Sequence, residues 1–372
     1  MSGVTIVPIT SRREISQFIQ VPYNLYQGDP NWVPILEMEQ RSWFKKSHEF
    51  YSHGAAQGFV ALNSNGRPMG RIMAIYEQLR AENHGGKLGG IGFFEAPDDP
   101  VIVSALFEAA EDWLRKRNLT HCRGPISLTE NDQYWGLLVH NFSQPYLGMN
   151  YNPPFYERLW LERGYTCAKE MYCYQLPLNG DVPQRLLPVA ERLKRQGHVT
   201  VRTIDMKNIR RDAEFLRQII NKGFIGVDDH IEVPPEMIDS MVKQLKPVID
   251  PDFVIIGFYD GEPASFVLAL PDWHLAFKYV NGKSDLISLI KLILYRKKIN
   301  RLRVSVFGTV PEHRNKGLEA AIFAHGYQLA LKKGIVAAEA AWTARDNRLM
   351  RAGIEAAGGV HYKTYNWYER EL

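Results

Sequence analysis

A short basic stretch, His313-Arg314-Asn315-Lys316-Gly317, has the residue types and the setting to hold an anion. Residues 304–310 before it form an apolar run rich in β-forming residues, which Pro311 ends. From Leu318 apolar residues recur at helical spacing as far as Gly334. The stretch therefore lies where a strand passes into a helix N-terminus, and there backbone N–H groups and the helix dipole attract an anion. The alternative is a solvated basic turn.

The whole chain has the composition of a folded globular protein. Its 372 residues, 45% hydrophobic and 23% charged, predict two domains. A net charge of +4 gives no reason to expect a nucleic-acid partner. We find neither a signal peptide nor an apolar run of about 20 residues that could span a membrane. A cytoplasmic protein, peripheral at most on the inner membrane face, is the expectation.

Metal and disulfide chemistry have no support in the sequence. The three cysteines, Cys122, Cys167 and Cys173, form no CxxC pair. No cluster of His, Cys and carboxylate residues has the spacing of metal ligands, so we expect no metal.

The chain reads as two copies of one mixed αβ unit. Residues 59–75 and 253–270 each contain two apolar strands around an Asn-Gly or Asp-Gly turn, the strongest hairpin signal. Each hairpin is followed by a strand, a turn, an amphipathic helix and another strand, at 120–127 and 335–342. Residues 176–184, with two prolines and a glycine, mark the join.

The strand-to-helix turns of the two copies differ in charge. In the first copy Asp99 is placed as an N-cap and Pro100 as the first helical residue, so that helix start is capped internally. Carboxylates there repel phosphate. In the second copy Gly317 lets the backbone approach a ligand closely, so only this turn suits a phosphate.

These features resemble the GNAT superfamily of acyl-CoA N-acyltransferases, whose pyrophosphate loop reads Arg/Gln-x-x-Gly-x-Gly/Ala between the fourth strand and the next helix. The resemblance implies acyl-CoA as the donor, with no metal. The cofactor-binding residues that it implies are Val310 for the pantetheine arm, Arg314, Asn315, Lys316, Gly317 and Leu318 for the pyrophosphate, and Asn347.

The chain departs from the family pattern at two places. The sixth loop position is Glu319 instead of Gly or Ala. Many GNAT enzymes place a tyrosine seven or eight residues after the equivalent of Asn347, and here those positions are Ile354 and Glu355. Groups that move protons must therefore come from elsewhere.

Nearly the whole chain is similar to a bacterial subgroup of tandem GNAT-like proteins that includes, or lies close to, the bacterial ceramide synthases. The stretches "YQGDPNWVPIL", "GFFEAPDD", "GPISLTEND" and "YNPPFYERLWLERGY" carry this resemblance. It implies an α/β fold (α+β, mixed sheet) of two tandem GNAT-like domains. We predict a degenerate acceptor-side domain at 1–178, a linker and helix at 179–200, and an acyl-CoA domain at 201–372.

Candidate catalytic and acceptor residues lie at strand ends and in loops. Glu339 lies on the strand expected to separate from 304–310, although it can equally be a structural carboxylate. In the first copy the candidate base is Asp132 or Glu95, and Tyr151 orients the amine or donates to the thiolate. Asn131, Asn152 and Tyr156 are candidate substrate-binding residues, each with a structural alternative as a loop, turn or packing residue.

Residues 285–303 carry an apolar helical stripe, Leu286, Leu289, Ile290 and Ile293, followed by several Arg and Lys residues. This is either a core helix with cations at its C-terminus or a contact for a membrane surface or an acyl carrier protein.

The predicted function is N-acyl transfer from an acyl-CoA thioester to an amine, with a long acyl chain and a sphingoid-type lipid amine as the sharpest expectation. The alternatives are a short-chain N-acetyltransferase acting on a small amine and a CoA-binding module without turnover.

Overall fold

The computed structural model describes residues 3–128, 133–178, 180, 183, 186–226 and 232–372. They form two compact units. Unit 1 comprises Met1–Met171, Ala276–Tyr295 and Lys363–Leu372, and unit 2 comprises Tyr172–Leu275 and Arg296–Tyr362. The first change of unit falls near the predicted boundary at 178. Unit 1 also takes two segments from the predicted second domain, because β13 (Val360–Glu371) pairs with β5 (His121–Gly124) from Tyr368 to Glu371.

Unit 1 has the strand order β1-β2-β3-β4-β5-β13, and β6 also pairs with β13. Helix α4 packs on one face of the hairpin β2–β3 through a core of Ile102, Leu106 and Phe107. The elements not yet given are β1 (Thr5–Pro8), α1 (Arg12–Leu25), α2 (Glu37–Ser42), β2 (Gly54–Leu62), β3 (Pro68–Glu77), α3 (Gln78–Asn83), β4 (Leu88–Glu95), α4 (Pro100–Arg115), β6 (Leu137–His140), α5 (Tyr156–Glu162) and α10 (Leu286–Tyr295).

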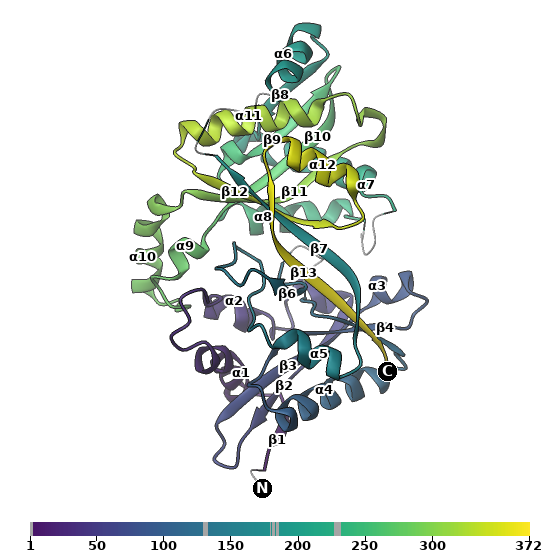
Figure 1. Cartoon of the computed structure of the whole chain (residues 1–372), viewed down its shortest axis with the longest axis vertical. Coiled ribbons are helices and arrows are strands. Elements are labelled where there is room, and N and C mark those ends of the chain that lie inside the picture. The colour runs from purple at the N-terminus through teal and green to yellow at the C-terminus, as the bar shows by residue number, and fades with distance from the viewer. Residues whose placement is uncertain (1–2, 129–132, 179, 181–182, 184–185, 227–231) are drawn as a thin grey trace. The chain divides into compact units, whose positions relative to one another are not determined.

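Unit 2 has the strand order β7-β12-β11-β10-β9-β8. Helices α11 and α12 pack on one face of this sheet, and α7 packs on β10 and β11 (Figure 1). The elements are β7 (Thr166–Pro177, which starts in unit 1), α6 (Leu187–Gln196), β8 (Val199–Thr203), α7 (Ile209–Gly223), α8 (Ile238–Leu245), β9 (Val254–Tyr259), β10 (Glu262–Pro271), α9 (His274–Phe277), β11 (Arg301–Thr309), α11 (Leu318–Lys332), β12 (Ala337–Ala344) and α12 (Arg348–Ala356).

Both predicted hairpins are confirmed, as β2–β3 and β9–β10. In the second, Asp260 and Gly261 have φ of 49° and 88°, the left-handed pair that a tight two-residue hairpin turn requires. The predicted helix starts are also confirmed: α4 begins at Pro100 after the N-cap Asp99, and α11 begins at Leu318. The two units therefore repeat the order of hairpin, strand, helix and strand.

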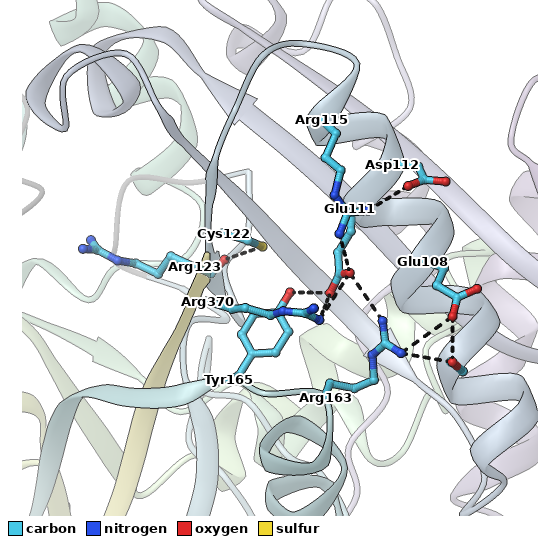
Figure 2. Close-up of polar contacts among 10 residues, drawn as sticks. Glu108, Glu111, Asp112, Arg115, Cys122, Arg123, Arg163, Tyr165 and Arg370 are labelled. Carbon is cyan, nitrogen blue, oxygen red and sulfur yellow. Dashed lines mark hydrogen bonds and ion pairs between the residues drawn. The ribbon is translucent and has the colours of Figure 1, made fainter. Parts of the chain in front are cut away.

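A buried carboxylate ties three parts of unit 1 together (Figure 2). Glu111 of α4 is 1% exposed and accepts hydrogen bonds from Tyr165 at 3.1 Å, from Arg370 of β13 at 3.1 Å and from Arg163 at 3.4 Å. Arg115, one turn further along α4, lies 3.3 Å from it. Because an ionised carboxylate is stable inside a protein only when such partners surround it, these contacts fix β13 and the end of α5 on α4.

Candidate functional site

Strands β11 and β12 separate part-way along their length. They pair in parallel from Arg301–Ala337 to Val304–Ala340, after which β11 continues to Thr309 and β12 to Ala344. The separation starts at a β-bulge, because Leu268 of β10 pairs with Val306 and Ala269 pairs with Val304, which leaves Ser305 as the extra residue. A bulge of this kind removes backbone groups from the ladder and makes them available to a ligand.

Ser305 lies at the bulge of β11 and carries a hydroxyl with unused hydrogen-bonding capacity. Its Oγ is buried and has no hydrogen-bond partner among the described residues. Such a group costs free energy unless something satisfies it, which marks the site where a polar ligand atom is expected. Sequence analysis passed over Ser305, although a serine in the apolar run 304–310 was a visible signal.

The loop after β11 is held firmly by backbone contacts. The Val310 N–H donates to the Ala264 carbonyl at 2.9 Å, and the Val310 carbonyl accepts from the His313 N–H at 3.0 Å. The Arg314 guanidinium donates to the Gly223 carbonyl at 2.7 Å, at the C-terminal end of α7, and to the Thr309 carbonyl at 3.3 Å. In this structure Arg314 therefore shapes the loop by binding carbonyl oxygens.

Lys316 is an exposed cation of the loop. Its Nζ lies 4.5 Å from the ring centroid of Tyr259 and 3.2 Å from Nδ1 of His313. His313 stacks on Tyr259 with centroids 4.6 Å apart. The stacking holds the cation and the imidazole together beside the start of α11.

The N-terminus of α11 is built to leave its N–H groups available. Asn315 and Gly317 have φ of 61° and 85°, and Gly317 is the N-cap residue. Among the described residues, no side chain accepts a hydrogen bond from the first turn, which Leu318 begins and which carries Glu319. Uncapped N–H groups at the positive end of a 15-residue helix can donate hydrogen bonds to an anion.

Asn347 has a local role in the structure. It is the N-cap of α12, where its Oδ1 accepts from the Met350 N–H at 3.2 Å, and it is exposed. Close to the C-terminal end of the same helix, the hydroxyl of Tyr174 on β7 donates to Glu355 at 3.2 Å. A tyrosine from another strand thus brings a phenol to the eighth residue after Asn347, where the sequence has no tyrosine of its own. Nothing in the sequence near Tyr174 pointed to this.

Glu339 lies one residue before the last paired residue of β12 in the β11–β12 ladder. It is fully buried, and the Tyr362 hydroxyl donates to its Oε2. Its register partner on β11 is Arg303, which is 2% exposed. The buried carboxylate therefore has a half-buried tyrosine as its hydrogen-bond donor, and a buried arginine is its register neighbour on β11.

In unit 1, Glu95 and Tyr156 meet in a buried cluster. The Glu95 carboxylate accepts from Tyr26 at 2.7 Å and from Tyr156 at 2.9 Å, and Arg71 lies 3.8 Å away. Burial raises the pKa of Glu95, while Arg71 and then the two tyrosine hydroxyls lower it. Tyr156 also accepts from the Ala96 N–H at 2.8 Å, so this cluster ties α5 to the end of β4.

The other predicted residues of unit 1 have separate surroundings. The Tyr151 hydroxyl donates to Asp29 at 2.7 Å, and burial followed by this carboxylate raises the pKa of the phenol. The Asn152 side chain bonds the N–H and carbonyl of Leu138 at 2.8 and 3.0 Å, which makes it a clamp on β6. Asn131 and Asp132 lie outside the described residues.

Glu39 of α2 is a titratable group that sequence analysis missed. Burial raises its pKa to about 7, opposed by a hydrogen bond from Tyr134. Tyr134 packs against Trp43, whose ring lies tilted against that of Phe93 with centroids 4.3 Å apart. The sequence did not point to Glu39, because its partner Tyr134 comes from a segment distant in the chain.

Metal binding and membrane spanning find no support in the described residues. In this part of the chain, no group of three or more His, Cys, Asp or Glu side chains is arranged to hold a metal ion. The helices of these residues also include none that is long and apolar enough to cross a bilayer.

Comparison with known proteins assigns the chain to a family. No family model matches it. The bacterial ceramide synthase of Caulobacter vibrioides is 31% identical over 383 residues, covering all of this chain and 98% of that protein. Among solved structures, a tandem GNAT protein from the clavulanic acid biosynthesis pathway has a TM-score of 0.60 at 13% identity, covering 99% of this chain and 98% of that one.

The glucosamine N-acetyltransferase region of a fungal multi-domain GH3 β-N-acetylglucosaminidase has a TM-score of 0.62 at 13% identity. It covers all of this chain, which spans 38% of that longer protein. At such identities both structures establish the fold, two GNAT-like units, while the relative from Caulobacter establishes descent. The chain belongs to the bacterial ceramide synthase family, and it is an N-acyltransferase with a tandem GNAT fold.

Proposed function

We propose that this enzyme transfers a long acyl chain from an acyl-CoA thioester to the amine of a sphingoid-type lipid, the reaction that a ceramide synthase performs. The observation that carries the donor side is the separation of β11 and β12 at the Ser305 bulge, followed by the uncapped N-terminus of α11. The acceptor rests on the relative that is 31% identical over the whole chain.

The donor would bind along unit 2. The pyrophosphate would accept hydrogen bonds from the N–H groups at the start of α11, with Lys316 adding charge. Because Arg314 already donates to the Gly223 and Thr309 carbonyls, we assign it to positioning the loop. The pantetheine arm would run from Val310 along β11, and Asn347 is kept as a candidate contact from α12.

The chemical step is a direct displacement. The neutral amine attacks the thioester carbonyl, the C–N bond forms, and the oxygen of the tetrahedral intermediate carries the negative charge. The C–S bond then breaks, the thiolate takes one proton, and the nitrogen loses one, which leaves an amide and coenzyme A. The Ser305 hydroxyl, with the N–H groups at its bulge, would donate to the oxyanion.

Cysteine chemistry does not favour a covalent acyl-enzyme. Burial raises the pKa of Cys122 to about 12, and burial also raises the pKa of Cys167. Cys173 is buried. Thiols of this kind are poorly ionised at neutral pH and are weak nucleophiles.

The proton leaving the amine would pass through Tyr362 to Glu339. Glu339 is fully buried and Tyr362 donates to it, so the tyrosine is the group that can touch a substrate while the carboxylate takes the charge. For the thiolate, Tyr174 beside Glu355 is a candidate donor, since burial raises the pKa of this phenol and keeps it protonated. Asp132, Glu95, Tyr151, Tyr156, Asn131 and Asn152 remain candidates for acceptor binding in unit 1, and the segment 285–303 is a candidate contact with the source of the lipid.

The test is a product assay with purified protein, palmitoyl-CoA or acetyl-CoA, and either sphinganine or a small amine. Thiol release and the mass of the amide are followed together. Palmitoyl-amide formed from sphinganine supports the proposal. Acetyl transfer to the small amine with no lipid product would favour a short-chain acetyltransferase, and CoA binding without any amide would favour a binding module.

Two variants examine the proton path. Tyr362→Phe and Glu339→Gln are expected to lower kcat by about 100-fold each, with little change in the Kd for CoA. If the double variant is no slower than either single variant, the two residues act as one unit.

A further inference from the structure

Helix α10 (Leu286–Tyr295) exposes its apolar side chains to solvent. Leu286 and Ile293 are each 72% exposed. Ser288 and Leu292, one turn apart, are the buried residues of the helix. The complete set of exposed aliphatic residues on α10 is Leu286, Ile287, Leu289, Ile290, Ile293 and Leu294. The core-helix interpretation of this segment is therefore wrong, since the stripe that looked like a core faces outward.

These six side chains form one continuous surface. At about 100° per residue they cover an arc of about 160°, and the buried Ser288 and Leu292 occupy the opposite side. An exposed apolar patch of this size along a helix of a globular protein marks an interaction site. The helix has 10 residues, about 15 Å, so it is far too short to cross a bilayer and suits a position lying in its surface.

Cations border the apolar arc. The exposed Lys291 follows it on the helix wheel, and the exposed Lys283 precedes the helix. Both lysines line a hollow of about 290 Å³ beside α10, together with Asn281 and Asp285. Arg296, Lys297 and Lys298 follow the helix directly in the chain and are exposed. Arg301 and Arg303 do not belong to this surface, because Arg301 bonds Asp272 and Arg303 is buried.

We propose that α10 and its bordering lysines dock this enzyme on an anionic phospholipid membrane. The aliphatic arc would enter the boundary between head groups and acyl chains, and Lys283 and Lys291 would contact lipid phosphates. The charge pattern favours a lipid surface over a second copy of this chain, since two such faces would bring like charges together. This docking surface rests on the proposed function, and it is where the enzyme would meet its lipid amine.

The experiment is co-sedimentation of the full chain with vesicles of phosphatidylcholine, with and without about one third phosphatidylglycerol. Wild type is expected to bind the anionic vesicles, and Leu286→Asp/Ile293→Asp to lose at least about tenfold in partitioning. Lys283→Gln/Lys291→Gln should bind less tightly and with a weaker salt dependence. The matched control is Leu349→Asp, since Leu349 of α12 is an exposed aliphatic residue, 82% exposed, outside this surface.

The proposal would be overturned if wild type does not bind the vesicles, or if Leu286→Asp/Ile293→Asp binds them as well as wild type does. It would also be overturned if wild type forms a dimer that Leu286→Asp/Ile293→Asp dissociates and Leu349→Asp does not. Capture of an acyl carrier protein without vesicle binding would likewise replace the lipid as partner. Acyl transfer is measured separately from membrane binding, as thiol release from a soluble acyl-CoA and a small amine without vesicles. A protein that binds vesicles but never releases thiol would refute the proposed function and leave the docking intact.

Discussion

Strands β4 and β5 of unit 1 correspond to strands β11 and β12 of unit 2. Each pair separates after its last paired residues, and the two units differ in what fills the resulting gap. In unit 1, β4 and β5 pair from Leu88–His121 to Gly90–Arg123, and β4 has its own bulge near Phe93. The Ile126 N–H then donates to the Ile91 carbonyl at 2.9 Å, so chain occupies the opening. In unit 2 the corresponding bulge holds the unpartnered hydroxyl of Ser305.

The strand-to-helix turns differ in the same sense. Asp99 caps α4 by accepting from the Val101 N–H at 2.9 Å, with Pro100 as its first residue. Gly317 starts α11 in the left-handed region with no side-chain cap. The same fold therefore has one helix start that is satisfied internally and one that a ligand anion can satisfy. Both units keep the same order of elements, and the proposed assignment of the donor to unit 2 rests on these few turn residues.

The filled opening of unit 1 is the feature most sensitive to mutation. A Cβ on Gly92 would lie 1.7 Å from the Ile126 carbonyl oxygen, so Gly92→Ala must displace backbone. We expect a loss of about 3 kcal/mol or more in the free energy of unfolding, measured by urea titration. The Kd for CoA should stay within about twofold, because the change lies in unit 1. A stable variant with weakened CoA binding would place the donor in unit 1.

Converting the unit 2 turn to the unit 1 type should weaken donor binding. In Gly317→Asp a carboxylate would occupy the N-cap and repel phosphate, and we expect the Kd for CoA to rise on the order of 100-fold by calorimetry. Gly317→Ala is the matched control, because it keeps the φ of 85° and the Cβ contact 2.9 Å from Val189 Cγ1 but adds no carboxylate. Equal losses in the two variants would mean that backbone strain, not the anion site, explains the effect.

Two serine hydroxyls of unit 2 separate catalysis from stability. Ser305→Ala removes a hydroxyl without a partner, so we expect an unchanged Tm and a fall in kcat of about tenfold. Ser265→Ala removes a hydroxyl that donates to the Gly308 carbonyl at 2.9 Å, and it should cost about 1–2 kcal/mol of stability. The Ser305 assignment fails if Ser305→Ala retains full kcat.

The smallest effect is a pH dependence from unit 1. Burial raises the pKa of Glu39 from 4.5 to about 7, so ionising it opposes folding. Its contribution to stability is full below about pH 4.5 and is lost as the pH rises to about 7. Glu39→Gln should therefore gain Tm relative to wild type between about pH 5 and about pH 8. Glu312→Gln, an exposed carboxylate of the unit 2 turn, is the control, and parallel Tm curves for wild type and Glu39→Gln would contradict the assignment.

Local patterns were sufficient to predict the repeat, both hairpins and the starts of α4 and α11, because turn residues and helical periodicity act over a few positions. The division into units was less predictable, since the pairing of β13 with β5 joins residues far apart in sequence. Buried environments were the least predictable part of the site. Arg314, Asn347 and Asn152 proved to be held by neighbouring backbone groups, and Glu39 has its hydrogen-bond partner in a distant segment.

The place of β13 in unit 1 has a consequence for synthesis in the cell. Strand β5 leaves the ribosome long before residues 368–371, its neighbours in the sheet, have been made. During that interval one edge of β5 lacks its neighbouring strand, and the carboxylate of Glu111 lacks its partner Arg370. A nascent unit 1 therefore stays incomplete while unit 2 is translated, and this long-lived open edge is where chaperones or pausing would affect the yield of native protein.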